Sequence, residues 1–152
     1  MNAPLTILGS GMAGLGLARQ LRARQPERPI TLITADSGDD YAKPLLSTGF
    51  AKGLAADALA TRSALDVADE LKLVMRTHTR VEALDPAARE LKIGRERLAY
   101  EQLVIATGAA PQPPFAIDAA LRHRRVFTIN DLDDYRAFHA ALARLGRPAR
   151  VA

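Results

Sequence analysis

The chain has 152 residues, 48% of them hydrophobic and 25% charged, which is enough to build one soluble globular domain with a single buried core. It has no cysteine, which excludes disulfides, thiolate metal sites and a cysteine redox pair, and it has neither an apolar run of about eighteen residues nor a basic leader, so we expect a cytoplasmic protein without a membrane span. The net charge of +4 would suit nucleic acid, but no aromatic residues interleave with the arginines to stack on bases, so no nucleic-acid or membrane partner is expected.

A β-α-β unit opens the chain. Residues 5–8 are a short apolar run that stops at Gly9, as a buried parallel strand would. A glycine-rich segment follows, and then a helix is predicted that ends near Arg24. Residues 30–33 read as a second buried strand, which makes the crossover between the two strands right-handed. The apolar face of the predicted helix consists of Leu15, Leu17, Ala18 and Leu21.

The middle of the chain predicts loops, a helix and further strands. Residues 34–53 read as loop-rich, and Ser63 is a good N-cap for a helix that carries Ala64, Leu65, Ala68 and Leu71. Residues 73–75 form a predicted strand. Between residues 79 and 100 the pattern changes to three short strands with turns at Asp85-Pro86 and Gly94, which predicts an inserted antiparallel meander. Residues 103–106 read as another buried strand.

The last part of the chain predicts one helix. Asn130 or Asp131 is expected to cap it, and Gly146 is expected to end it. Its apolar face would consist of Leu132, Tyr135, Phe138, Leu142 and Leu145. The final residues, 150–152, look like the start of a new strand, and we interpret this as truncation. The arginines at 122, 124 and 125 are expected to lie on a solvated linker.

The glycine segment has the spacing Gly-x-Gly-x-x-Gly between a strand and a helix, the context that dinucleotide binding requires. Gly9 would permit the tight turn, Gly11 would let a pyrophosphate approach the backbone, and Gly14 would let the helix pack close to the strand. The amides near Met12 and Ala13 would face the phosphates at the positive end of the helix dipole.

Asp36 lies twenty-two residues beyond Gly14, at the end of the second strand. A carboxylate there can accept hydrogen bonds from the adenosine ribose hydroxyls, and it disfavours a 2′-phosphate and therefore NADPH. These features recognise only the ADP part of a cofactor, so by themselves they leave NAD and FAD both open.

Several motifs resemble the FAD domain of the pyridine-nucleotide-dependent flavoprotein reductases. They are residues 9–14, the segment 41–48 (YAKPLLST), Val81, and Ala106-Thr107-Gly108. Ferredoxin reductases of this family carry roughly Tyr-x-Arg-Pro-x-Leu-Ser-Lys at the second motif. The second motif of this chain instead resembles the rubredoxin–NAD reductase branch of the family. Residues 77–81 and 129–135 resemble the same branch. The resemblance implies an α/β fold: a Rossmann-like parallel sheet with an inserted three-stranded antiparallel meander, here truncated.

The resemblance also implies roles for individual residues. Lys43, followed by Pro44, would lie along the FAD pyrophosphate and ribityl chain, where a cation neutralises phosphate charge. Val81 would bind the adenine edge through its backbone, and Thr107-Gly108 would end a strand beside the cofactor. Thr48 departs from the lysine that ferredoxin reductases place near the flavin ring, which leaves flavin tuning open but not flavin binding.

The function that the resemblance implies is a reductase that passes electrons from NADH through FAD to a small redox protein such as rubredoxin or ferredoxin. Residues 1–115 would be the FAD-binding domain, and 116–152 a linker and helix leading to a missing NAD(P)H-binding domain. Without that domain, and without a later Gly-Asp segment, we expect weakened or lost FAD binding and no turnover. The alternatives are a stand-alone NAD-binding Rossmann module and a non-catalytic interaction domain. The predicted cofactor-binding residues are Gly9, Gly11, Met12, Ala13, Gly14, Asp36, Lys43, Pro44, Val81, Ala106, Thr107 and Gly108.

No catalytic or metal-ligating residue is predicted. The histidines at 78, 123 and 139 have no partner spacing for a metal site or a triad and read as surface or half-buried side chains. Asn130 matches a family position near the flavin, but helix capping explains it as well. Asp39 and Asp40 read as turn residues.

Overall fold

A computed structural model describes residues 4–113, 115–118, 121, 125–146 and 149–150. The chain divides into two compact units. Unit 1 comprises residues Met1–Tyr41 and Thr61–Gly108, and unit 2 comprises Ala42–Ala60 and Ala109–Ala152. Histidine 123, the arginines at 122 and 124, and the end of the strand predicted at 150–152 lie outside the described residues, so the predictions made for them stay predictions.

Unit 1 contains the predicted parallel sheet. Its strands are β1 (Leu5–Leu8), β2 (Ile30–Ile33), β5 (Val74–Arg76) and β9 (Gln102–Ile105), in the order β5-β2-β1-β9. All three pairings are parallel, and Leu5 lies opposite both Ile30 and Gln102. The four strands were all expected, and β5 and β9 differ from the prediction by one residue at their ends.

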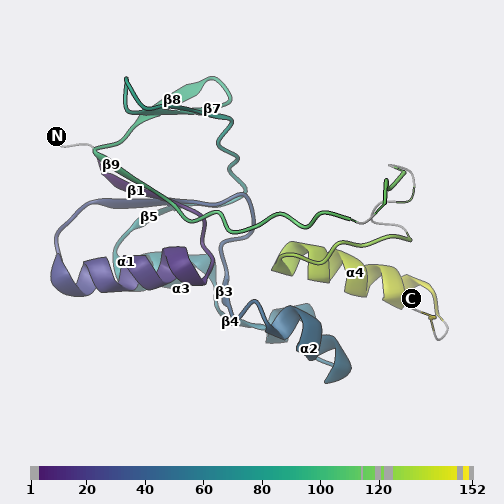
Figure 1. The fold of residues 1–152 in the computed structure, drawn as a ribbon. Coiled ribbons are helices and arrows are strands. Elements are labelled where there is room, and N and C mark those ends of the chain that lie inside the picture. The colour runs from purple at the N-terminus through teal and green to yellow at the C-terminus, as the bar shows by residue number, and fades with distance from the viewer. Residues whose placement is uncertain (1–3, 114, 119–120, 122–124, 147–148, 151–152) are drawn as a thin grey trace. The chain divides into compact units, whose positions relative to one another are not determined.

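Unit 1 has three layers, because helices α1 (Met12–Arg24) and α3 (Ala64–Leu71) cover one face of the parallel sheet and a meander covers the other (Figure 1). Successive side chains of β1 and β2 point to opposite faces of the sheet. Ile7 and Leu32 join the core under the helices, whereas Leu8 and Ile33 join the core under the meander. Both central strands are therefore buried on two sides, which explains their uninterrupted apolar sequences.

The meander consists of β6 (Ala83–Asp85), β7 (Glu90–Ile93) and β8 (Glu96–Ala99), paired antiparallel, as predicted. Leu91 points into the core and is fully buried. Arg76 of β5 donates to both carboxylate oxygens of Glu96 in β8, at 2.8 and 2.6 Å. This pair connects the meander to the parallel sheet.

Helix α3 begins where the sequence predicts. Ser63 is its N-cap and forms a reciprocal capping box with Asp66. The apolar residues named for this helix are confirmed in part: Leu71 is buried and Ala68 packs against the core, but Leu65 is 78% exposed and Val67, which was not expected, is fully buried. Val67 and Leu71 are four residues apart, so they lie on the same side of the helix and face the sheet.

The prediction that residues 34–53 are loop-rich is wrong in part. This stretch contains β3 (Asp40–Tyr41) and α2 (Leu45–Ala51), and η1 (Ala56–Ala58) and β4 (Ala60–Arg62) follow. Helix α2 has seven residues and contains Gly49, so helical propensity alone would not maintain it. Gly49 packs against Leu59 and the hydroxyl of Tyr135, which indicates that tertiary contacts stabilise α2.

Unit 2 is built around α4 (Leu132–Arg144), whose N-cap is Asp131. Tyr135 and Phe138 are buried as predicted, but Leu145 is 49% exposed, because the helix has ended one residue before it. Gly146 follows with φ 61°, a left-handed conformation that favours glycine after a helix. None of the helices in the described part of the chain is long and apolar enough to cross a membrane.

Aromatic rings fill the interior of unit 2. The Tyr135 and His139 rings lie 4.4 Å apart, and Phe138 lies 5.3 Å from Phe50 and 5.4 Å from Phe127. The Tyr135 hydroxyl donates to the Leu54 carbonyl at 3.0 Å. Burial raises the pKa of this phenol, so it retains the proton that it donates.

Candidate functional site

The glycine segment joins β1 to α1 at the carboxyl end of the parallel sheet. Gly9 has φ 104°, and a Cβ placed on it would overlap the Ala106 carbonyl oxygen and lie 2.8 Å from the Ala106 carbonyl carbon. Glycine is thus required here for two reasons, the left-handed backbone and the close approach of the chain that leaves β9. Only the first of these could be anticipated from the motif.

Gly14 and Gly11 have opposite surroundings. A Cβ on Gly14 would overlap the Gly9 carbonyl oxygen, lie 3.0 Å from its carbon and lie 3.5 Å from the Ile7 side chain, so α1 packs directly on the loop and close to strand β1. A Cβ on Gly11 would meet nothing within 4 Å, and its φ of −67° suits any residue. The fold itself does not require glycine at position 11, and the open space is suitable for a ligand that approaches the backbone.

Within the described part of the chain, the amides of Met12, Ala13 and Gly14 in the first turn of α1 have no hydrogen-bond partner. Its N-cap is Gly11, which offers no side-chain acceptor, and the turn contains no acidic residue. Met12 and Ala13 are exposed. Backbone N–H groups in this position carry the positive end of the helix dipole and are suited to bind an anion.

Asp36 follows β2 and is partly buried. Its Oδ1 accepts hydrogen bonds from Ser10 Oγ at 3.1 Å, Thr34 Oγ1 at 2.5 Å and the Gly38 amide at 3.0 Å. No described residue donates to Oδ2. One carboxylate oxygen is thus engaged by the protein and the other remains available as an acceptor.

Val81 lies before β6 and packs with its side chain against the core that contains Leu8 and Ile33. Within the described ranges its backbone N–H and C=O make no hydrogen bond, whereas the next amide, of Glu82, donates to the Lys92 carbonyl at 2.8 Å. A residue whose backbone N–H and C=O are both free can donate to and accept from polar atoms at the edge of a planar ring.

The end of β9 lies beside the glycine loop. The Ala106 amide donates to the Leu8 carbonyl at 2.8 Å, which extends the β1–β9 pairing by one residue. Thr107 and Gly108 are exposed, and Gly108 has φ 69°. Unit 1 thus brings the loop, the first turn of α1 and the end of β9 together at one edge of the sheet.

Lys43 and Pro44 belong to unit 2. Pro44 is the N-cap of α2, and the Lys43 ammonium donates to the Asn130 side-chain oxygen at 2.9 Å. The capping explanation for Asn130 is wrong, because Asp131 accepts from the Asp134 amide and is the cap. The Lys43–Asn130 pair spans 87 positions, and no local sequence pattern indicates it.

The two histidines in the described part of the chain, His78 and His139, do not lie together in a site. His78 is exposed, and the His139 ring lies among the aromatic rings of unit 2, where its Nε2 is buried without a hydrogen-bond partner. Across the described residues, no three His, Asp or Glu side chains gather as metal ligands would.

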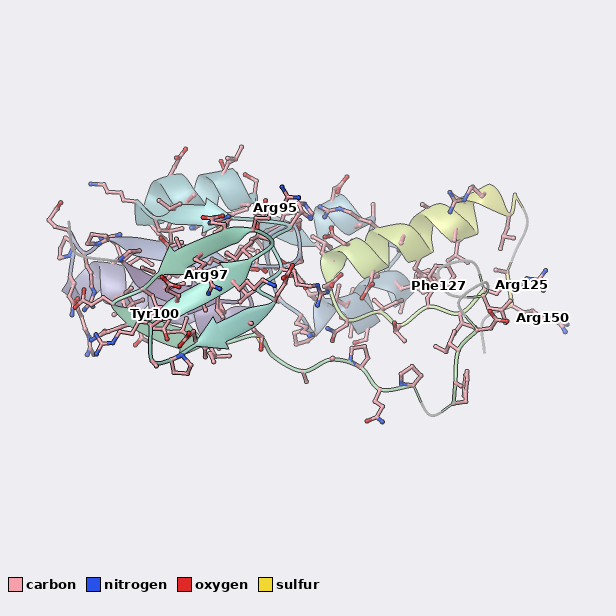
Figure 2. The ribbon with its side chains drawn as sticks, turned by 90° about the horizontal axis from the view of Figure 1, so that it is seen from above. Arg95, Arg97, Tyr100, Arg125, Phe127 and Arg150 are labelled. Carbon is pink, nitrogen blue, oxygen red and sulfur yellow. The ribbon has the colours of Figure 1, made fainter. Side chains whose placement is uncertain are left out.

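The arginines labelled in Figure 2 do not belong to one unit. Arg95 and Arg97 lie in the meander region of unit 1, whereas Arg125 and Arg150 belong to unit 2.

The residues of unit 1 fit the ADP half of a dinucleotide. The open space over Gly11, the uncapped amides of α1 and the free Oδ2 of Asp36 supply, in turn, room, donors for phosphate and an acceptor for ribose. The sequence profile of the pyridine nucleotide-disulphide oxidoreductases matches residues 3–152. The chain belongs to this family.

Relatives within the pyridine nucleotide-disulphide oxidoreductase family are similar over most of this chain. A rubredoxin-NAD(+) reductase of Alcanivorax borkumensis is 39% identical over 140 residues, which are 91% of this chain and 36% of that protein. A nitric oxide reductase FlRd-NAD(+) reductase of Pectobacterium atrosepticum is 38% identical over 143 residues, which are 93% of this chain and 36% of that protein. The chain spans about a third of the length of these relatives.

Solved structures of the family share the fold. The chain of the covalent putidaredoxin reductase-putidaredoxin complex has a TM-score of 0.78 at 28% identity, over 93% of this chain and 34% of that one. NADH:rubredoxin oxidoreductase from Clostridium acetobutylicum has a TM-score of 0.72 at 22% identity, over 97% of this chain and 37% of that one, which supports the fold alone. The α/β fold with a parallel sheet and a separate antiparallel sheet is therefore that of the family.

Proposed function

We propose that this chain is the FAD-binding part of an NADH-dependent flavoprotein reductase that passes electrons to a small redox protein such as rubredoxin or ferredoxin. The observation that carries the proposal is the pair formed by the open space at Gly11 and the half-engaged carboxylate of Asp36. The names of the relatives, rubredoxin-NAD(+) reductase and putidaredoxin reductase, support the kind of electron acceptor.

The proposal assigns the ADP half of FAD to unit 1. The amides at Met12 and Ala13 would bind the pyrophosphate, the free oxygen of Asp36 would accept from the ribose, and the backbone of Val81 would bind the adenine edge. Gly9 and Gly14 act indirectly, since they let strand, loop and helix approach one another closely enough to form the cradle.

The remaining assignments rest on the resemblance to the family. Lys43 and Pro44 would lie along the pyrophosphate and ribityl chain, and Ala106, Thr107 and Gly108 would line the cofactor at the end of β9. We propose residues 1–115 as the FAD-binding domain and 116–152 as the connection to an NADH-binding domain. Bound flavin would supply hydride acceptance and one-electron release, while the protein binds and orients it. The expected cytoplasmic location stays a prediction.

The first experiment tests the ADP-binding site with the chain itself. We would follow FAD fluorescence while protein is added and compare FAD with FMN, which lacks the ADP half. We expect saturable binding of FAD, competition by ADP and no binding of FMN. Affinity well below that of a full-length rubredoxin-NAD(+) reductase is expected. Binding of FMN as strong as that of FAD, or the absence of any ADP effect, would refute the assignment.

A matched pair of glycine variants separates binding from folding. Gly11→Ala adds a methyl group where the fold has open space, so we expect unchanged thermal unfolding but about tenfold weaker ADP binding or more, since the methyl group occupies the phosphate position. Gly16→Ala adds the same group to α1, also in open space, and should leave ADP binding unchanged. Equal ADP affinities of the two variants would contradict the assignment of Gly11.

A further inference from the structure

Two buried hydroxyls lie behind the carboxylate of Asp36. Ser10, inside the glycine segment, is 6% exposed, and Thr34, directly after β2, is 5% exposed. Ser10 Oγ is 3.0 Å from Thr34 Oγ1, and both hydroxyls reach Asp36 Oδ1. The dinucleotide-binding motif specifies the three glycines and the acid at position 36, but it specifies neither Ser10 nor Thr34.

The protons of this cluster can be assigned. A carboxylate only accepts, so the hydroxyl of Thr34 donates to Asp36 Oδ1 at 2.5 Å. The hydroxyl of Ser10 donates either to the same oxygen or to Thr34 Oγ1, at 3.1 and 3.0 Å. With the Gly38 amide at 3.0 Å, Oδ1 is surrounded by protein donors, and the carboxylate cannot rotate without losing them.

The backbone around the cluster is also fixed. The Thr34 amide donates to the Arg76 carbonyl, and the Thr34 carbonyl accepts from the Thr79 amide, both at 2.9 Å. The Asp36 carbonyl accepts from the His78 amide at 2.9 Å. Asp36 is therefore held from both sides, through its backbone by residues 76–79 and through its side chain by Ser10 and Thr34.

We propose that Ser10 and Thr34 are positioning residues that hold the Asp36 carboxylate with Oδ1 engaged and Oδ2 presented to the ribose hydroxyls of an ADP-containing ligand. This inference rests on the proposed function, because it concerns the same site. A carboxylate fixed before the ligand arrives loses little conformational entropy on binding, and this raises the affinity. The same fixed negative oxygen repels a 2′-phosphate, so the pair contributes to selection of an unphosphorylated ribose.

The test compares two ligands on the 152-residue chain by isothermal titration calorimetry. The first ligand is ADP, and the second is 2′,3′-dideoxy-ADP, which lacks both hydroxyls that Oδ2 would bind. We expect Thr34→Val to weaken ADP binding about threefold to tenfold, the size of one side chain's ordering cost. The same variant should change dideoxy-ADP binding by less than about twofold, since Asp36 has no ribose hydroxyl to hold there.

Four further variants guard against a purely structural effect. Thr34→Ser restores the hydroxyl and should recover most of the ADP affinity. Thr31→Val makes the same chemical change at a buried threonine of β2 that does not contact Asp36, and it should leave both ligands unaffected. Ser10→Ala provides an independent route if Thr34→Val does not fold, and it should also weaken ADP selectively. In Asp36→Asn, the additional effect of Thr34→Val on ADP should vanish.

The outcomes separate the two hypotheses. If the unaltered chain binds neither ligand, the proposed function fails and the inference fails with it. If it binds ADP but Thr34→Val and Ser10→Ala bind ADP equally well, only the positioning role is refuted. A loss of both ligands in parallel also refutes it, because that result indicates damage to the fold.

Discussion

The glycine segment of unit 1 and the Lys43 segment of unit 2 each contain predicted site residues, and they are constructed in different ways. The first is a backbone construction, in which Gly9 and Gly14 allow close approach and the amides of α1 remain free. The second is a side-chain construction, in which the Lys43 ammonium donates to the Asn130 side chain and the following helix, α2, packs its Phe50 ring against Phe138. A site built from the backbone can be predicted from a short sequence motif. A site built from side chains can be predicted only when it is known which distant segments of the chain meet.

The largest expected effect tests whether side-chain packing maintains unit 2. Phe138→Ala removes a buried ring that packs against Phe50 and Phe127, and we expect a loss of about 3–5 kcal/mol in the free energy of unfolding. Urea unfolding measures it. Phe115→Ala is the matched control, since Phe115 is 62% exposed in the same unit and its removal should cost less than about 0.5 kcal/mol. Equal costs would show that the aromatic cluster does not stabilise unit 2.

The next effect tests the backbone construction of unit 1. Gly14→Ala places a Cβ against the Gly9 carbonyl, so α1 must move away from the loop, at a cost of about 3 kcal/mol. Gly16→Ala, two residues further along α1, meets no atom and should stabilise the chain by up to about 1 kcal/mol through helix propensity. Thermal unfolding of the two variants compares them directly. Similar stabilities would mean that the loop adapts more easily than its geometry suggests.

A smaller effect is expected for the charge at Lys43. If its ammonium lies along the FAD phosphates, Lys43→Gln should weaken FAD binding by up to about fivefold, as for an exposed charge pair, and added salt should reduce the difference. Lys52→Gln alters the other lysine of the α2 region and should leave FAD affinity unchanged. Fluorescence titration at two salt concentrations measures both variants. Equal weakening in both would indicate a general effect of net charge instead.

The smallest effect concerns pH and unit 1 alone. The hydrogen bonds from Arg76 lower the pKa of Glu96 below its ordinary value of 4.5. Because the folded-state pKa is the lower one, the pair stabilises the fold above pH 4.5, and this contribution is lost as the pH falls through the folded pKa. Glu96→Gln should therefore show a shallower decline of stability in acid.

The control for this pH effect is Glu27→Gln, since Glu27 is exposed and has no ion-pair partner among the described residues. Urea midpoints at neutral pH and at about pH 3.5, below the ordinary carboxyl range, measure both variants. Identical slopes for Glu96→Gln and Glu27→Gln would show that the Arg76–Glu96 pair, which lies at the surface, adds nothing to stability.

The sequence alone determined the parallel strands, the meander, the capped helix at Ser63 and the glycine segment with Asp36. These features depend on periodicity or on motifs whose parts are close together in the chain, so each residue's task follows from its neighbours. The loop-rich interpretation of residues 34–53 failed because α2 contains Gly49 and lacks helical propensity of its own. Its packing partners, Leu59 and Tyr135, come later in the chain and cannot be recognised from a local window.

Which groups of the candidate site are engaged by the protein, and which stay available, follows from the three-dimensional fold and not from the sequence pattern. The fold pairs Lys43 with Asn130, places Ser10 and Thr34 against the Asp36 carboxylate, and gives the backbone of Val81 no hydrogen-bond partner among the described residues. Hydrogen bonds of this kind depend on positions and directions to within a fraction of an ångström. Residue types and spacing specify which groups are present, but the fold determines which of them remain available to a ligand.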